Sequence, residues 1–210
     1  MVFANGDLCQ SELAAAPAPE DLIIAADGGY RHCQMLEILP DCLIGDLDST
    51  PEKVIRTWEK EGVKIIRHPE QKDETDLELA LLFAQTRGAR TIIVYGAAGG
   101  RLDMTLGNLL LLAHPGLTAQ LTLICGGQEV RGLKPGETLE LSGNPGDTVS
   151  LIALLPDTSG ITTRGLEYAL DEGSLALGIT RGISNLMNSK QARISLNNGL
   201  LAVIHTRNNL

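Results

Sequence analysis

Short apolar runs alternate with helical patterns over the first 125 residues, and this alternation constrains the fold more than any other feature. The runs lie at 22–26, 42–44, 63–66, 91–95 and 121–125. They are apolar on both faces, as strands of a parallel sheet covered by helices are. Between them, Pro51 after Ser49 and Thr50 indicates a helix start, and leucine-rich stripes predict helices over 73–87 and 103–113. The repetition predicts an α/β fold.

The second half of the sequence follows a different pattern. Turn signals are dense at 134–136, 144–146 and 197–199, and the segments between them are short. Leu175, Leu177 and Ile179 alternate with smaller residues, which predicts a strand, and the Asn-Gly turn at 198–199 between apolar segments predicts a hairpin. We therefore expect an α/β domain over 1–127, followed by a small all-β sandwich or barrel domain over 128–210.

Aspartates follow the predicted strands of the first half, each near the carboxyl end of a strand. They are Asp27, Asp46, Asp48, Asp73, Asp76 and Asp103. Parallel strands bring these ends to one edge of the sheet, where such folds bind ligands. Gathered carboxylates repel one another, and a hard cation such as Mg²⁺ relieves that repulsion. Each aspartate could instead cap a helix, but Asp46 and Asp48 are two residues apart and cannot both cap one helix start.

A glycine-rich loop at 96–103 precedes the third predicted helix. Its small residues, among them Gly99 and Gly100, would let backbone N–H groups approach a phosphate, and Arg101 could pair with phosphate oxygens. The loop lacks the Gly-Lys-Ser/Thr ending of a P-loop and the G-x-G-x-x-G pattern. A plain strand-to-helix turn is the alternative interpretation.

Two further features could contact a nucleotide. Asp27, Gly28 and Gly29 form a second glycine-rich turn after a strand. Lys72 beside Asp73 could bind phosphate or could be a solvated surface lysine. The four histidines are scattered and form no recognisable catalytic or metal-binding set.

Charge and cysteine usage exclude several classes of partner. The formal net charge of −9 disfavours binding to nucleic acid or to an anionic membrane. No apolar segment reaches the roughly 20 residues of a membrane span, and the N-terminus shows no signal peptide. The cysteines lack C-x-x-C spacing, and three of them lie among apolar residues. They are Cys9, Cys33, Cys42 and Cys125, of which the last three read as buried thiols. We expect a soluble, cytoplasmic protein.

Four motifs in order give the sequence a family resemblance. Asp-Gly-Gly at 27–29, Gly-Asp-Leu-Asp-Ser at 45–49, Lys-Asp-Glu-Thr-Asp at 72–76 and Gly-Gly-Arg-Leu-Asp at 99–103 occur with Asn108 behind the last. This ordered set resembles the thiamine pyrophosphokinase family. Arg-Gly-Ile-Ser-Asn at 181–185 resembles the thiamine-side segment of that family.

The resemblance implies an ATP-binding catalytic domain over 1–127 and a thiamine-binding β-sandwich over 128–210. It implies transfer of a diphosphate group from ATP to the thiamine hydroxyl with Mg²⁺ as cofactor, and a homodimer whose active site joins the α/β domain of one subunit to the β domain of the other. The implied catalytic and Mg²⁺-binding residues are Asp46, Asp48, Asp73 and Asp103. The implied nucleotide-binding and thiamine-binding residues are Asp27, Gly28, Lys72, Asp76, Gly99, Gly100, Arg101, Ser184 and Asn185.

Several points stay open at this level. Met104 stands where family members often have histidine, and Trp58, the only tryptophan, lies in the first half. Stacking on thiamine would then fall to another residue, such as Tyr168, or be absent. Either Asp73 or Asp103 could accept the hydroxyl proton. The alternatives are a diphosphokinase for another alcohol such as a hydroxymethyl pterin, a non-catalytic nucleotide-binding module, and a phosphohydrolase. The pair at 184–185 could also be a simple β-turn.

Overall fold

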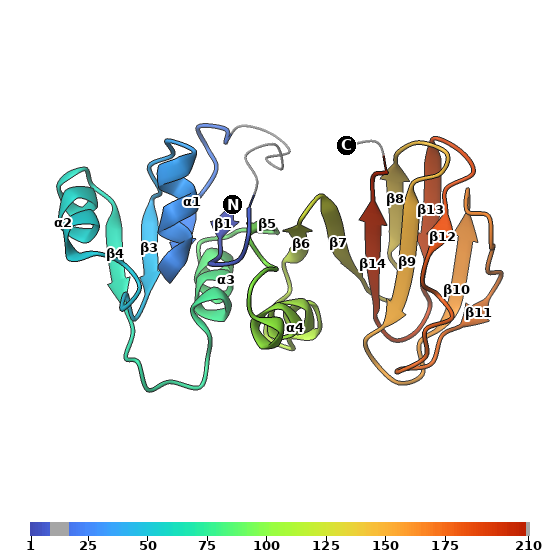
Figure 1. Ribbon diagram of the computed structural model, residues 1–210. Helices are drawn as coiled ribbons and strands as arrows, with labels where there is room; N and C mark the ends of the chain where they lie inside the picture. The colour runs from blue at the N-terminus through green and yellow to red at the C-terminus, as the bar shows by residue number, and fades with distance from the viewer. Residues whose placement is uncertain (9–16, 209–210) are drawn as a thin grey trace. The chain divides into compact units, whose positions relative to one another are not determined.

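The computed structural model describes residues 1–8 and 17–208. Their contacts divide the chain into two compact units, Met1–Gly126 and Gly127–Leu210. Each unit has its own cluster of buried apolar side chains. Figure 1 shows the first unit in blue to green and the second in olive to red.

The first unit contains a parallel sheet. The strands lie in the order β6 (Gln120–Cys125), β5 (Thr91–Tyr95), β1 (Val2–Phe3), β2 (Ile24–Ala26), β3 (Cys42–Gly45) and β4 (Lys64–Arg67), and every neighbouring pair is parallel. The two-residue strand β1 lies between β2 and β5 and is buried. The central strands are buried on both faces, as the apolar runs predict.

Helices connect these strands. They are α1 (Tyr30–Met35), which follows the 3₁₀ turn η2 (Asp27–Gly29), α2 (Glu52–Lys60), α3 (Asp76–Thr86), and α4 (Leu102–Leu110), which continues into η3 (Leu111–Ala113). Helix α3 begins three residues later than the pattern predicts, because the Thr75 hydroxyl accepts a hydrogen bond from the Glu78 backbone N–H and caps it. Helix α1 lies outside the predicted helices, since six residues offer too short a periodic pattern. The predicted α/β class is confirmed.

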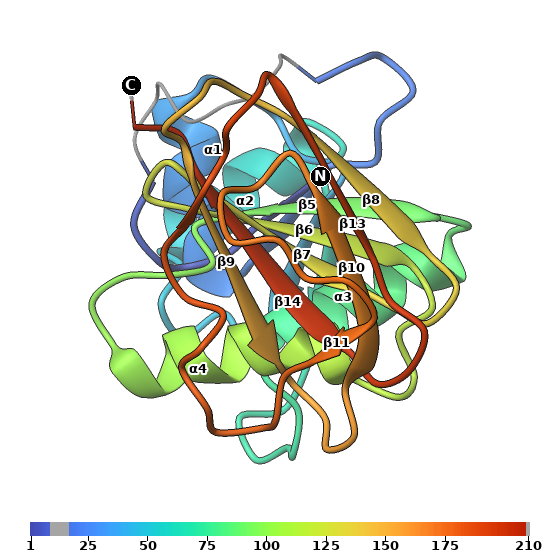
Figure 2. The ribbon, with the colours of Figure 1, turned by 90° about the vertical axis from the view of Figure 1, so that its right-hand side faces the viewer.

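The second unit contains two antiparallel sheets. One has the order β12 (Asn185–Leu186), β9 (Thr148–Ala153), β14 (Leu201–Thr206), β7 (Gln128–Leu133), and the other has the order β11 (Gly173–Ser174), β10 (Ser159–Arg164), β13 (Gln191–Ser195), β8 (Thr138–Ser142). Figure 2 shows β9 beside β14 and β10 beside β13. Side chains from both sheets, such as Val203 and Ile194, share one core. This is the predicted sandwich.

The predicted hairpin at 198–199 is wrong. Strands β13 and β14 flank the turn, but β13 pairs with β8 and β10, whereas β14 pairs with β7 and β9. The turn therefore carries the chain from one sheet to the other, which lets both strands cover the same core. Gly199, with φ of 91°, makes this close passage possible, since a Cβ atom there would lie 2.4 Å from the Thr158 hydroxyl oxygen.

The predicted strand over 175–179 is also wrong. Only Gly173–Ser174 is extended and paired in this region. Leu175 is buried, but Leu177 and Ile179 are 54% and 57% exposed, so the alternation does not mark a buried face.

Two other expectations concern the cysteines and the membrane. Cys33, Cys42 and Cys125 are buried, as predicted, and Cys9 lies outside the described residues. Within 1–8 and 17–208, no helix combines the length and apolar character needed to cross a bilayer.

Candidate active site

Three aspartates from separate elements converge at the carboxyl edge of the parallel sheet. Asp27 follows β2, Asp46 follows β3, and Asp76 begins α3. One carboxylate oxygen of each lies within 4.8 Å of one oxygen of each of the others. Asp27 is 7% exposed and has φ of 36°, a conformation that aspartate tolerates better than most residues. The sheet topology thus joins residues that are up to 49 positions apart.

Gly45 gives the three carboxylates room to meet. A Cβ atom at this position would lie 2.9 Å from Cβ of Asp27 and 3.2 Å from Oδ1 of Asp76. Its φ of 154° is also unfavourable for other residues. Any side chain here would push Asp27 and Asp76 apart, so the convergence depends on glycine at this strand end.

The carboxylate cluster is electrostatically strained. Burial raises the pKa of Asp27, and the neighbouring Asp76 and Asp46 add to the rise, while hydrogen bonds from Ser49 and the Gly28 backbone oppose it. Charge repulsion between the carboxylates favours protonation or a bound cation. A site of this kind suits a hard cation that takes oxygen ligands.

Lys72 is the cation that contacts this cluster among the described residues. Its Nζ atom lies 2.8 Å from Oδ1 of Asp76 and 3.6 Å from Oδ2 of Asp46. Oδ1 of Asp76 is shielded from solvent and accepts no well-directed hydrogen bond within the described part of the chain. Its partner is the Lys72 ammonium, at 2.8 Å.

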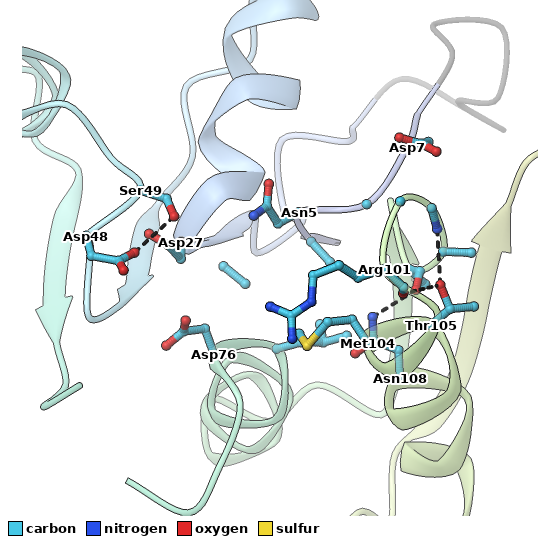
Figure 3. A pocket seen from close by; sticks show the side chains of 18 residues that line it. Asn5, Asp7, Asp27, Asp48, Ser49, Asp76, Arg101, Met104, Thr105 and Asn108 are labelled. Atoms are coloured by element: carbon cyan, nitrogen blue, oxygen red, sulfur yellow. Dashed lines mark hydrogen bonds between the residues drawn. The ribbon is translucent and has the colours of Figure 1, made fainter. Parts of the chain in front are cut away.

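A cavity of about 380 Å³ opens beside the cluster. Figure 3 shows Asp27, Asp48 and Asp76 on one side of it and Met104, Thr105 and Asn108 on the other, with Arg101 extending between them. Small residues line much of the remaining wall. They are Ala4, Gly6, Ala26, Ala97, Ala98, Gly99 and Gly100. The cavity is therefore bordered by carboxylates on one side and by small residues, which leave the backbone accessible, along much of the remaining wall.

Two side chains of α4 hold the glycine-rich loop against the helix start. The buried Asn108 side chain donates to the Ala97 carbonyl at 2.8 Å. The Thr105 hydroxyl accepts from the Gly99 N–H at 3.2 Å and donates to the Arg101 carbonyl at 3.1 Å. These bonds fix the loop at the N-terminus of a nine-residue helix, where backbone N–H groups favour an anion.

Apart from Asp73 and Asp103, the predicted residues of the first unit divide into three groups. Asp27, Asp48, Asp76, Gly99, Gly100 and Arg101 line the cavity. Asp46 and Lys72 join the carboxylate cluster. Gly28 lies against the Asn5 side chain, and a Cβ atom there would be 2.3 Å from it.

Asp73 and Asp103 lie outside the three-carboxylate cluster. Both are exposed. Asp103 forms a two-bond ion pair with Arg101, at 2.6 Å for the shorter contact. Hydrogen bonds from Arg101 and the Met104 backbone N–H hold the pKa of Asp103 below its ordinary value. The roles expected for Asp73 and Asp103 stay predictions.

The two predicted residues of the second unit differ in their surroundings. Ser184 is exposed, with φ of 62°, and its N–H donates to the Ser150 hydroxyl at 3.0 Å. The buried Asn185 side chain accepts from the Tyr168 N–H at 3.0 Å and donates to the Tyr168 carbonyl at 2.8 Å. Asn185 thereby fixes the backbone of Tyr168, a residue that is 67% exposed.

Residues 5–7 line the cavity but are missing from the sequence-based site. All three follow β1, and two of them face the glycine-rich loop: the Gly6 N–H donates to the Gly96 carbonyl at 2.8 Å and the Asp7 N–H to the Ala98 carbonyl at 2.7 Å. Asn5 instead contacts Gly28. The rule that ligands gather after parallel strands would have found them. The two-residue length of β1 concealed the signal.

Comparison with known proteins gives matches over both units. Residues 16–125 match the family described as thiamin pyrophosphokinase, catalytic domain, and residues 137–201 match thiamin pyrophosphokinase, vitamin B1 binding domain. A thiamine pyrophosphokinase of Bacillus subtilis (strain 168) is 32% identical over 188 residues, which cover 88% of this chain and 87% of that protein.

Solved structures agree with the sequence matches. The crystal structure of thiamine pyrophosphokinase from Bacillus subtilis has a TM-score of 0.86 and 28% identity, covering 99% of this chain and 98% of its own. A thiamin pyrophosphokinase family protein from Enterococcus faecalis has a TM-score of 0.85 and 26% identity, with the same coverage of the two chains.

Proposed function

The chain belongs to the thiamine pyrophosphokinase family, and from this premise we propose that it transfers the diphosphate group of ATP to the hydroxyl of thiamine, giving thiamine diphosphate and AMP. The observation that carries this function is the convergence of Asp27, Asp46 and Asp76 beside a cavity bordered by a glycine-rich loop. Diphosphate transfer needs charge neutralisation and positioning more than covalent help from the protein. The site offers both.

The carboxylate cluster fits a divalent cation such as Mg²⁺. Its donors are carboxylate oxygens, one of them shielded from solvent without a well-directed hydrogen bond, and Gly45 leaves space between them. Asp27, Asp46 and Asp76 would hold the ion, with Asp48 at the cavity wall. Bound there, Mg²⁺ would neutralise charge on the phosphate oxygens. We keep Asp73 and Asp103 as the candidates for accepting the hydroxyl proton.

The residues around the glycine-rich loop would bind the phosphates of ATP. Gly99 and Gly100 border the cavity at the start of α4, and Arg101 extends into it. Arg101 would exchange its pairing with Asp103 for phosphate oxygens, which match guanidinium geometry. We therefore assign ATP binding and catalysis to residues 1–127.

We assign thiamine binding to residues 128–210. The Tyr168 ring is exposed on a backbone that Asn185 fixes at both its N–H and its carbonyl. An exposed aromatic ring on a fixed backbone loses little conformational entropy when a flat ring stacks on it. Tyr168 is thus the proposed stacking residue, with Ser184 beside the vitamin.

We also propose a homodimer in the cytoplasm, with each active site completed by the β domain of the other subunit. Leu102, Leu106 and Leu110 are 81%, 56% and 50% exposed and recur every four residues on α4. Such an exposed apolar stripe is typical of a surface that another protein covers. The buried thiols of Cys33 and Cys42 are consistent with a reducing compartment.

Product analysis tests the reaction directly. The protein is incubated with ATP, Mg²⁺ and thiamine, and nucleotides and thiamine phosphates are separated by chromatography. We expect AMP and thiamine diphosphate in equal amounts. ADP with thiamine monophosphate, or AMP that forms without thiamine, would contradict the proposal. A parallel incubation with a hydroxymethyl pterin tests the alternative acceptor.

A further inference from the structure

Lys72 places its ammonium group among the carboxylates that are proposed to hold the metal. Its Nζ atom lies 2.8 Å from Oδ1 of Asp76 and 3.6 Å from Oδ2 of Asp46. It also donates to the Pro69 carbonyl at 3.2 Å, and its side chain is only 11% exposed. A solvated surface lysine would not be held in this way, so the contacts require an explanation.

The contacts are those of a charged, confined group. Two carboxylates and one backbone carbonyl surround the Lys72 ammonium, and the side chain is only 11% exposed. It stands at the position where a cation relieves the repulsion among Asp27, Asp46 and Asp76, whose oxygens lie within 4.8 Å of one another.

The lysine can also leave this position without unfolding anything. It lies between β4 and α3, outside any regular element, and its charge is carried on a flexible four-carbon stem. It precedes Asp76 by four residues in a segment without regular structure, so its ammonium can swing away from the carboxylates while its backbone stays in place. Arginine or a helical lysine would be less free to move.

We propose that Lys72 is a tethered cation that occupies the carboxylate cluster until a divalent cation displaces it, and that its ammonium then turns to the nucleotide phosphates. This inference rests on the proposed use of a divalent cation by the same site. Free cation must compete with Lys72 and binds weakly. Cation that arrives with nucleotide brings its own phosphate partner for the displaced ammonium, so loading by the cation–nucleotide complex is favoured.

Direct competition makes a specific prediction for cation affinity in the absence of substrates. The K72M variant lacks the competing ammonium but keeps an aliphatic chain of similar length. We expect its dissociation constant for Mn²⁺ to fall about tenfold or more relative to the unaltered protein. K72R keeps a cation and should stay near the unaltered protein. K60M removes an exposed lysine at the end of α2 and should also change nothing.

Mn²⁺ binding is titrated by electron paramagnetic resonance at about 0.5 M KCl. At this salt concentration the interactions between distant charges are screened, whereas those between charges in direct contact are not. Thermal unfolding provides a second measurement, in EDTA and in saturating Mn²⁺. In EDTA, K72M should melt at a lower temperature than K72R. Saturating Mn²⁺ should raise the melting temperature of K72M by more than it raises that of K72R. Equal Mn²⁺ affinities for K72M and the unaltered protein would overturn the proposal, as would a K72M variant that binds no Mn²⁺.

A measurement on the unaltered protein guards against a misfolded variant. The ammonium protons of a confined lysine exchange slowly with water, so the ¹⁵N-labelled ammonium group of Lys72 should give a visible nuclear magnetic resonance signal in metal-free protein. We expect Mg²⁺ to abolish this signal, and its persistence at saturation would contradict displacement. None of these three measurements contains ATP or thiamine. If these measurements fail but the protein still forms thiamine diphosphate, only the proposed role of Lys72 is rejected. If K72M shows the expected gain in Mn²⁺ affinity but the unaltered protein forms no thiamine diphosphate, only the proposed reaction is rejected.

Discussion

Replacing Asp27 with asparagine should stabilise the metal-free protein and weaken its binding of divalent cations. Asp27 is buried, and burial together with Asp76 and Asp46 raises its pKa. The folded chain therefore holds the Asp27 proton more tightly than the unfolded chain does. The free energy of unfolding falls as the pH rises from 3.8, the pKa of Asp27 in the unfolded chain, through its raised pKa in the folded chain. At neutral pH the whole of this loss of stability is present. D27N removes this cost because its amide stays neutral.

The geometry gives the size of the effect. The carboxylate oxygens lie within 4.8 Å of one another, and two unit charges at that limit repel by about 3 kcal/mol at an effective dielectric constant of about 20. Lys72 offsets part of this repulsion, and the Thr50 hydroxyl donates to Oδ1 of Asp27 at 3.3 Å, a bond the amide oxygen can keep. A net gain of about 1–2 kcal/mol remains, which corresponds to a rise in melting temperature of roughly 3–6 °C.

The assay is thermal unfolding in EDTA, followed by circular dichroism between pH 7 and pH 4. The stabilisation by D27N should be largest at pH 7 and should shrink as the pH falls toward 4. In saturating Mg²⁺ the order should reverse, because only the unaltered protein has the third carboxylate. D157N is the matched control, since exposed Asp157 also has a positive φ, of 60°. A D27N variant that is less stable than the unaltered protein at pH 7 in EDTA would refute the reasoning.

Four other substitutions test separate parts of the site. G45A should cost about 1–3 kcal/mol in a denaturant titration and weaken Mn²⁺ binding at least tenfold, because its methyl group displaces Asp27. N108A should raise the KM for ATP more than the KM for thiamine and cost about 1–2 kcal/mol, through loss of the bond that holds the loop. D48N should remove most of kcat without changing the unfolding midpoint, and near-normal turnover would exclude a role in metal handling. L106E should shift sedimentation toward the monomer, and an unchanged sedimentation coefficient would count against α4 as the dimer surface.

The arrangement of the candidate site was accessible from the sequence because it depends on topology. Aspartates that follow parallel strands must reach one edge of the sheet, and Asp27, Asp46 and Asp76 do so. Which carboxylates touch depends on local backbone geometry that no spacing reveals. The positive φ of Asp27 and the absence of a side chain at Gly45 let the carboxylates of Asp27 and Asp76 come together. The exposed ion pair of Arg101 with Asp103 is likewise decided by side-chain conformation.

The incorrect expectations share a cause in the second unit. An Asn-Gly turn favours a hairpin locally, but β13 and β14 pair with other strands because both sheets must cover one core. Alternation over 175–179 imitates a half-buried strand, yet Leu177 is exposed. In both places the partner of a segment is chosen by distant parts of the chain, which a local pattern does not contain.

Anomalous diffraction from crystals grown with Mn²⁺ and a non-hydrolysable ATP analogue tests the central claim most directly. A manganese peak should lie within about 2.5 Å of carboxylate oxygens from Asp27, Asp46 and Asp76, with the ammonium of Lys72 moved away. A peak held elsewhere with these carboxylates still paired to Lys72, or no peak at all, would contradict the proposal that they form the metal site.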